Sequence, residues 1–478
     1  MNSQEIINRI SKIVGKTQVL SSDEIENYLI DHRRRYHGKA IAVVRPGTVD
    51  EVRQVVRFCY EHNIPMVPQG GNTGLCGGAT PSMTGDAIII SMSRLNTIQM
   101  VDAPNNTITV DAGCTIENIY EAAKSQNRLF ALDLPSDGTA QIGGALASNA
   151  GGTAVLRYGN AKDMVLGVEA VLPDGRLYSN LRALRKDNTG YDIDQLLVGS
   201  EGTLGIITSA VLKLYPLPRH KSTAWLAIET PEKGRDLLNT MRAVCGDCLT
   251  AFEIISRTSI ELVFKHIANT HDPMDTIYPW YVLVEVSNVI DSEEHEALFL
   301  KALEAGLENG LIEDAVVAAT RLQANQLWHI RESMNDAQRI EGISIKHDIS
   351  IPISKIPDFL RQTEKMLTTD YPNVRIVAFG HIGDGNIHYN VSMADPDANG
   401  PFIKKRPEIN RKIYDLVDQL GGSFSAEHGI GQLKIGELKR YRGEVAVSLM
   451  AAIKTAFDPK NLMNPGKMLD QASLDQIK

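Results

Sequence analysis

Three glycine-rich stretches, at 69–78, 142–152 and 199–205, constrain the fold of the first half of the chain most. Glycines let backbone N–H groups come close to an anion and adopt conformations with positive φ. The first stretch follows the apolar, strand-like run 64–68, an arrangement that suits a pyrophosphate, although each loop taken alone is more often a tight turn. Because the sequence has neither GxGxxG nor GxxxxGK[ST], the three loops together favour a dinucleotide held outside a Rossmann fold.

The segments between these loops alternate between strand-like and helical patterns. Residues 41–44 and 87–91 are expected to be strands. Residues 49–63 predict an amphipathic helix, capped by Thr48 or Asp50. Its apolar positions are Val52, Val55, Val56 and Cys59. Beyond the prolines of 215–218, which mark the expected domain boundary, the pattern is of an α+β kind.

The length and net charge of the chain exclude some classes of function. A chain of 478 residues predicts two or three domains, and the net charge of −9 argues against nucleic acid or an anionic membrane as the main partner. No apolar run reaches the roughly 18 residues of a membrane-spanning helix, and the first ten residues lack a secretory pattern, so we expect a cytoplasmic protein. Cys245 and Cys248 form a lone CxxC, more typical of reduced thiols than of a redox or zinc site. The sequence has no iron–sulfur or haem motif, so any electrons that the protein handles must leave through another molecule.

The segment GHIGDGNIHYN at 380–390 predicts a β-hairpin. If Asp384 and Gly385 form a two-residue turn, His381 lies directly across from His388, with Cβ atoms roughly 4.5–5.5 Å apart. Two such imidazoles can hold a divalent metal, expected to be zinc, with Glu427 as a third ligand and open positions for substrate. His428 is then left as a base beside the metal. The alternative is that both histidines are polar residues of a turn and bind no metal.

Seven motifs carry a resemblance to a known family. They lie at 68–78, 133–152, 157–159, 199–208, 380–390, 425–431 and 457–467. With them the chain resembles the FAD-dependent D-2-hydroxyacid dehydrogenases of the vanillyl-alcohol-oxidase (PCMH-type) flavoprotein superfamily, and within it the D-2-hydroxyglutarate dehydrogenases. The resemblance implies an α+β fold with a two-part FAD-binding domain at 1–218, an antiparallel-sheet substrate (cap) domain at 219–420, and a C-terminal helical segment at 421–478 that returns to the flavin.

The resemblance also assigns the site residues. The metal ligands fall on His381, His388 and Glu427, and the catalytic base on His428. Substrate contacts fall on Arg331, Asn335, Lys346, Asn390 and His428, with Asn335 standing where the family usually has threonine. FAD contacts fall on Pro68, Gly70, Gly71, Asn72, Thr73, Gly74, Pro135, Ser136, Gly138, Gly143, Gly144, Ser148, Asn149, Gly152, Glu201, Gly205, Ile207 and Asn464. Since 68–78 contains no histidine, the flavin is expected to be bound non-covalently.

The implied reaction oxidises the C2 alcohol of a D-2-hydroxyacid. The metal would lower the pKa of the hydroxyl, His428 would take its proton, and the hydride would pass to N5 of FAD. Lys346 favours a second carboxylate, hence D-2-hydroxyglutarate, because a buried unpaired ammonium is costly. The alternatives are a D-lactate, D-malate or glycolate dehydrogenase, or a flavin subunit of a larger redox complex. Electrons would pass to an external acceptor such as an electron-transferring flavoprotein, a quinone or a cytochrome. A homodimer is one expected assembly of the protein.

Overall fold

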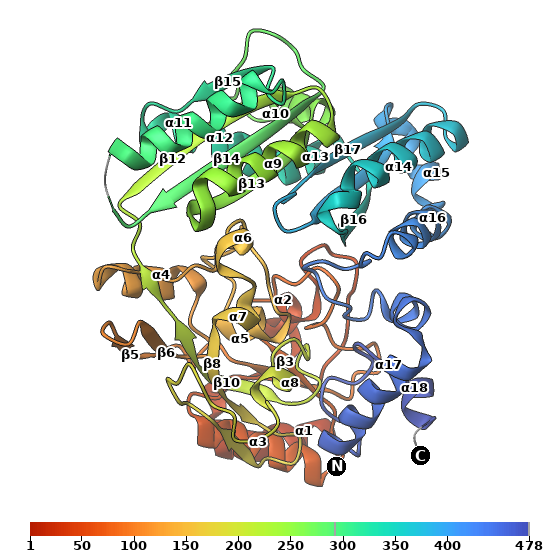
Figure 1. Cartoon of the computed structure of the whole chain (residues 1–478). Coiled ribbons are helices and arrows are strands. Elements are labelled where there is room, and N and C mark those ends of the chain that lie inside the picture. Colours follow the sequence, from red (N-terminus) through yellow and green to blue (C-terminus); the bar gives the residue numbers. More distant parts are fainter. Residues whose placement is uncertain (291–292, 477–478) are drawn as a thin grey trace. The chain divides into compact units, whose positions relative to one another are not determined.

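The computed structural model describes residues 1–290 and 293–476, which form two compact units (Figure 1). Unit 1 comprises 1–152, 159–217 and 427–478, and unit 2 comprises 153–158 and 218–426. Each unit is built on its own sheets, which agrees with the predicted α+β fold. The three-part division at residues 218 and 420 stays a prediction.

Unit 1 contains a four-stranded sheet in the order β1 (Val19–Leu20), β2 (Ala42–Val44), β4 (Ile88–Ser91), β3 (Met66–Gln69). The strands β2, β4 and β3 are parallel, and β1 is antiparallel to β2. Helices α1 (Ser3–Val14) and α3 (Val49–Glu61) share the core of this sheet. The prediction for α3 is confirmed: the Thr48 side chain accepts from the N–H of Glu51, and all four predicted apolar residues are fully buried.

The second sheet of unit 1 is antiparallel and carries the connections that hold two of the glycine loops. Its order is β5 (Ile98–Asp102), β6 (Thr107–Asp111), β10 (Ile206–Lys213), β8 (Val165–Val171), β9 (Leu177–Ser179). Helices α4 (Ile116–Ser125) and α5 (Ile142–Ala147) lie in the connection between β6 and β8. The glycine stretch 142–152 therefore opens with α5, and the stretch 199–205 leads directly into β10.

The C-terminal part of unit 1 returns to the strand before the first glycine loop. The N–H of Met66 in β3 donates to the carbonyl of Leu462, and the N–H of Asn464 donates to the carbonyl of Met66, both at 2.7 Å. Residues 462–464 therefore continue the sheet next to β3, which would otherwise be its edge. The preceding helix α17 (Ile435–Phe457) is interrupted by Gly443 at φ 76°, and the short α18 (Gln471–Asp475) follows.

Unit 2 is built on a seven-stranded antiparallel sheet, as predicted for the cap domain. Its order is β15 (Asp314–Val317), β12 (His220–Ile228), β14 (Trp280–Asn288), β13 (Leu249–Ser256), β17 (Val374–Gly380), β18 (Asn386–Met393), β16 (Ile345–Ser350). Helices α10 (Arg257–His266), α12 (Arg321–Glu332) and α13 (Met334–Glu341) bury one apolar face. Helix α9 (Pro231–Cys245) covers the other face, where Gly234 approaches Ile228 and Ile254.

The turn between β17 and β18 differs from the prediction. His388 pairs with Phe379, so His381 is not directly across from His388, and the connection is the five-residue loop 381–385. The reason is that the N–H groups of Asp384 and Gly385 both donate to the carbonyl of His381, at 3.1 Å. Asp384 and Gly385 are therefore the last two residues of a wider turn.

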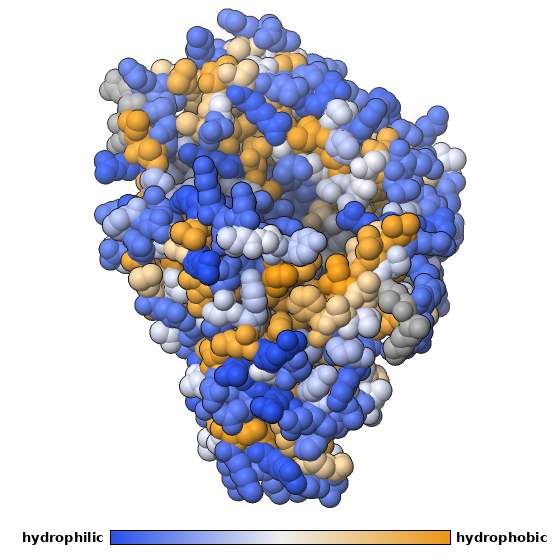
Figure 2. All heavy atoms as spheres, turned by 60° about the horizontal axis from the view of Figure 1, so that its bottom comes forward, coloured by the Kyte–Doolittle hydropathy of each residue, from blue (hydrophilic) through white to orange (hydrophobic). Residues whose placement is uncertain are grey.

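Two further observations concern the surface and the thiols. In the described part of the chain, no helix is long and apolar enough to cross a membrane. On the face shown in Figure 2, hydrophilic residues predominate and hydrophobic ones form separate patches. All five cysteines are free thiols, and burial raises the pKa of Cys245, at the end of α9, to about 11.

Candidate active site

The predicted substrate and metal residues of unit 2 share one face of its sheet. In the antiparallel register, Lys346 pairs with Asn390 and Asp348 pairs with His388. Residues directly opposite each other, and residues two apart in a strand, point to the same side. The four side chains therefore lie on one face, which Phe379 extends through its pairing with His388.

The two histidines lie close together although the predicted register was wrong. The ring centroids of His381 and His388 are 5.8 Å apart and their planes are inclined by 78°. His388 also packs against Phe379, with ring centroids 5.1 Å apart. The Nδ1 atom of His388 is 3.9 Å from the carboxylate of Asp348. The wider turn thus brings the two imidazoles together from the loop and from β18.

Glu253 was missed in the sequence analysis. It lies in the middle of β13 and is fully buried. One carboxylate oxygen accepts a hydrogen bond from Nδ1 of His381, and the other accepts from Nε of Arg331 at 2.7 Å. Burial raises the pKa of this carboxyl, but the charges and hydrogen bonds of Arg331 and His381 outweigh that effect and lower it to about 2. A single acid within the apolar run LTAFEIIS was the available signal, since a buried charge needs a partner.

Glu427 is the predicted third ligand beside the two histidines, and it follows directly after the last residue of unit 2, Ala426. Chain connectivity keeps Glu427 near the sheet, because the N–H of the preceding residue, Ala426, donates to the carbonyl of Asp348. Since Nδ1 of His381 bonds to Glu253, Nε2 is the nitrogen available for a metal. Two imidazoles and a carboxylate form a donor set that fits zinc.

His428 follows Glu427 directly in the chain, and its imidazole can itself bind a metal. His428 is therefore an alternative ligand as well as the predicted base. The two roles are distinguishable, since a ligand is needed for metal binding and a base only for turnover.

The predicted substrate residues differ in their surroundings. Arg331, at the end of α12, is buried, and its guanidinium lies over the Phe379 ring at 4.9 Å from the centroid. Asn390 is held at both ends of its amide: it accepts from the N–H of His347 at 3.3 Å and donates to Gln338 at 2.9 Å. Asn335 lies in the first turn of the next helix, α13, and is exposed.

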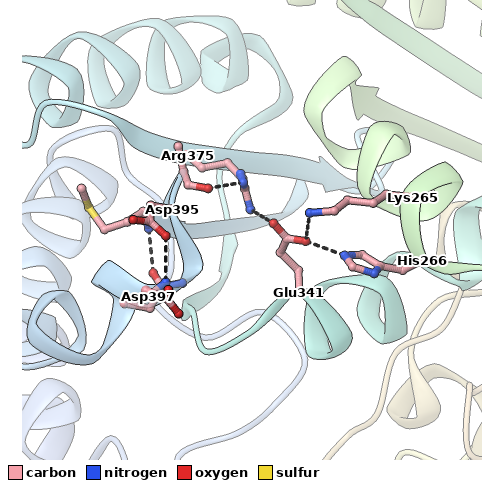
Figure 3. A network of polar contacts seen from close by, with 9 residues as sticks. Lys265, His266, Glu341, Arg375, Asp395 and Asp397 are labelled. Atoms are coloured by element: carbon pink, nitrogen blue, oxygen red, sulfur yellow. Dashed lines mark hydrogen bonds and ion pairs between the residues drawn. The ribbon is translucent and has the colours of Figure 1, made fainter.

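A group of ion pairs anchors the end of α13. Glu341 accepts from Lys265 at 2.7 Å, from Arg375 at 2.5 Å and from His266 (Figure 3). Burial raises the pKa of this carboxyl, but the three hydrogen bonds outweigh that effect and lower it to about 2. The helix that carries Asn335 is thereby tied to α10 and to β17.

The glycines in the loops of unit 1 pack closely against backbone at some positions and leave open space at others. A Cβ atom at Gly71 would lie 2.0 Å from the carbonyl oxygen of Thr139, and one at Gly152 would lie 2.0 Å from that of Asp133. Only glycine permits such close approach. At Gly74 and Gly144, by contrast, a Cβ would meet no atom of the described residues within 4 Å, which leaves room beside the backbone. These loops therefore fit FAD.

Asn464 and Glu201 join three of the predicted FAD segments. Asn464 is buried with φ 48°, and its amide donates to the carbonyls of Gly78 and Glu201 at 2.9 and 2.8 Å. Its Oδ1 has no hydrogen-bond partner among the described residues, and so can accept from a ligand. The Glu201 carboxylate accepts from the N–H groups of Ile430 and Gly431, both at 2.7 Å. Burial raises the pKa of Glu201, whose two hydrogen bonds fix the loop that follows His428.

The remaining FAD contacts that the resemblance implies stay predictions. Asn72 and Asn149 have positive φ (54° and 50°), and their side chains bond within unit 1 to the carbonyl of Ile30 and the N–H of Lys162. The others lie in β3, α5, β10 and the loops next to these elements: Pro68, Gly70, Thr73, Pro135, Ser136, Gly138, Gly143, Ser148, Gly205 and Ile207. Which of these atoms touch the flavin stays a prediction.

Comparison with known proteins identifies the family of both halves of the chain. Residues 40–179 match the FAD binding domain family, and residues 217–468 match the C-terminal domain of FAD linked oxidases. D-2-hydroxyglutarate dehydrogenase of Xanthomonas citri pv. viticola is 36% identical, over 94% of this chain and 93% of its own. A Schizosaccharomyces pombe protein, provisionally named a mitochondrial D-lactate dehydrogenase, is 35% identical over 97% of this chain and 90% of its own.

A solved structure shows the same fold. The crystal structure of p-cresol methylhydroxylase with substrate bound superposes with a TM-score of 0.78, at 17% identity, over 98% of this chain and 97% of its own. The relatives and the two family matches together cover nearly the whole chain. The chain therefore belongs to the FAD-dependent D-2-hydroxyacid dehydrogenase family.

Proposed function

We propose that this oxidoreductase converts D-2-hydroxyglutarate to the 2-oxoacid with non-covalent FAD and a divalent metal, zinc. The observation that carries the proposal is the distribution of charge on the sheet face of unit 2. Lys346 is on this face and Arg331 covers it, and both lie on elements next to the paired imidazoles of His381 and His388. Such a face offers cations to one carboxylate and a metal site to the other end of the substrate.

The cofactors define what the protein must supply. A metal held by His381, His388 and Glu427 would lower the pKa of the substrate hydroxyl, and FAD would accept the hydride from C2. His428, next to Glu427 in the chain, would remove the hydroxyl proton, a role suited to an imidazole at neutral pH. Glu201 supports this step by holding the N–H groups of the loop directly after His428.

The choice of acid follows from charge. Arg331 shares the negative charge of Glu253, and Lys346 adds a cation to this face. A dicarboxylate can form an ion pair with Lys346, whereas D-lactate offers only a methyl group at that end. D-malate is the shorter dicarboxylate alternative. D-lactate is the second candidate, because a relative of similar identity carries that provisional name.

The direct experiment is anaerobic reduction of the bound flavin by single D-2-hydroxyacids. We expect D-2-hydroxyglutarate to bleach the flavin with the highest kcat/KM, D-malate more slowly, and D-lactate and glycolate least. Turnover with an artificial dye would then show that the purified chain needs no partner subunit. Fastest bleaching by D-lactate, or no bleaching without a partner protein, would contradict the proposal. We further propose a separate protein, quinone or cytochrome as the natural acceptor.

A further inference from the structure

The carboxylate of Glu253 links two groups that the proposed reaction uses at different ends of the substrate. Its first oxygen accepts from the ring of His381, in the loop after β17, and its second from Arg331, in α12. These partners lie 128 and 78 residues away in the sequence. The side chain of Glu253 is fully buried in the central strand β13. It therefore holds both His381 and Arg331 from a rigid element of the sheet.

Each hydrogen bond fixes an orientation. The bond to Nδ1 of His381 sets the tautomer in which Nε2 carries the lone pair needed for a metal. The bond to Nε of Arg331 leaves the outer edge of the guanidinium for a carboxylate. Phe379 adds a second constraint, because Arg331 lies over its ring at 4.9 Å and the His388 ring lies 5.1 Å from it.

We propose that Glu253 is a positioning residue that fixes the separation between the metal-binding and carboxylate-binding ends of the site, and so selects the chain length of the D-2-hydroxyacid. The inference rests on the proposed function, in which the C1 carboxylate and C2 hydroxyl lie at the metal and the distal carboxylate at Arg331. With both ends bound to one carboxylate, neither can shift to accept a substrate one carbon shorter. Glu253 itself touches neither substrate nor metal.

The test compares Glu253→Gln with a matched control, Glu285→Gln. The amide introduced by Glu253→Gln would keep the volume but could accept only one of the two hydrogen bonds. Glu285 is also buried, in the neighbouring strand β14, and its carboxylate binds Lys221 at 3.0 Å and Trp328 of α12 at 3.1 Å. Its pairing with Ala251 places it on the same sheet face as Glu253. The control therefore disturbs the same sheet face and helix, but not His381 or Arg331.

Two quantities are measured on the purified FAD-loaded protein. Competition with a chelator gives the Kd for Zn²⁺, and steady-state kinetics give the ratio of kcat/KM for D-2-hydroxyglutarate to that for D-malate. For Glu253→Gln we expect Zn²⁺ affinity to fall by about 10- to 100-fold, as for other partners of ligating histidines, and the ratio to fall by at least about tenfold. Glu285→Gln should leave both within about twofold of wild type, even if its melting temperature is lower.

A second variant keeps the test decisive if Glu253→Gln does not fold. Glu253→Asp retains the charge that Arg331 needs, but its carboxylate is one methylene shorter and cannot reach both partners. We expect it to fold and to lose the preference for D-2-hydroxyglutarate over D-malate. If either folded variant keeps the wild-type Kd and ratio while His381→Ala loses Zn²⁺, the inference is wrong and the proposed function stands. If wild type binds no Zn²⁺, the proposed function itself fails.

Discussion

Lys454 offers the sharpest test of how the C-terminal segment is held in unit 1. The residue is 5% exposed, and its ammonium donates to the Asp458 carboxylate (2.6 Å), the Met463 carbonyl (2.8 Å) and the Thr203 carbonyl (2.9 Å). Burial lowers the pKa of Lys454, and the charge of Asp458 opposes that shift. Replacing Lys454 with Met keeps most of the volume, so the change removes mainly the charge and the three hydrogen bonds.

The expected cost follows from the groups left behind. Asp458 is 2% exposed and would keep a buried charge without its cation, a change that costs about 3–5 kcal/mol. The N–H of Met463 still donates to the same carboxylate oxygen, at 2.7 Å, which favours the lower end of that range. The two carbonyls that lose their donor add about 1 kcal/mol. We therefore expect Lys454→Met to lower the free energy of unfolding by about 4 kcal/mol, and the melting temperature by roughly 10 °C.

The assay is thermal unfolding followed by circular dichroism, with flavin fluorescence reporting FAD release. Lys460→Met is the matched control, because Lys460 is exposed and donates only to the carbonyl of Tyr60 among the described residues. Adding Asp458→Asn to Lys454→Met should recover part of the loss, since the amide carries no charge. The reasoning is refuted if Lys454→Met melts within about 2 °C of wild type, or if the double variant is no more stable than the single one.

Four further predictions concern the cofactor, the metal, the substrate and pH. Acid or heat should release intact FAD, because 68–78 contains no histidine to tether it; flavin that stays on the denatured chain, detected by gel fluorescence, would contradict this. His381→Ala should lose bound metal in elemental analysis while its flavin spectrum stays unchanged, and full metal occupancy would exclude the ligand role. Lys346→Met should lower kcat/KM toward D-2-hydroxyglutarate by roughly 10- to 150-fold but leave D-lactate unaffected; equal losses would exclude a distal-carboxylate contact. Glu341→Gln should be less stable than wild type at pH 7 in urea unfolding. Because the pKa of Glu341 is lowered from 4.5 to about 2, that difference should shrink as pH falls below about 4.5, and a constant difference would contradict the ion-pair explanation.

Local patterns predicted local structure well. Helix α3 formed as expected because its cap and its four apolar positions lie within one short segment. The proximity of the two histidines was also predicted, but from a two-residue turn that the loop 381–385 does not form. Hydrogen bonds to the His381 carbonyl determine that turn, and an Asp-Gly pair alone does not distinguish the two arrangements.

The roles of Glu253 and Glu201 lie beyond what local patterns can predict. Glu253 bonds to residues 78 and 128 positions away, and Glu201 bonds to backbone groups 229 and 230 positions away. The sequence indicates that an acid in an apolar strand needs a partner, but the partner depends on which strands and loops become neighbours. The family resemblance assigned Glu201 to FAD, which stays a prediction; that its carboxylate holds the loop after His428 could not be predicted from the sequence.

The return of residues 462–464 to β3 has a consequence for synthesis on the ribosome. Strand β3 is complete by Gln69, yet the segment that covers its outer edge is made almost 400 residues later. All of unit 2 emerges in between. Until then the nascent chain presents an uncovered edge strand, which can pair with another chain. We therefore expect truncation before Leu462 to favour aggregation during expression, and unit 2 to be able to fold before unit 1 is finished.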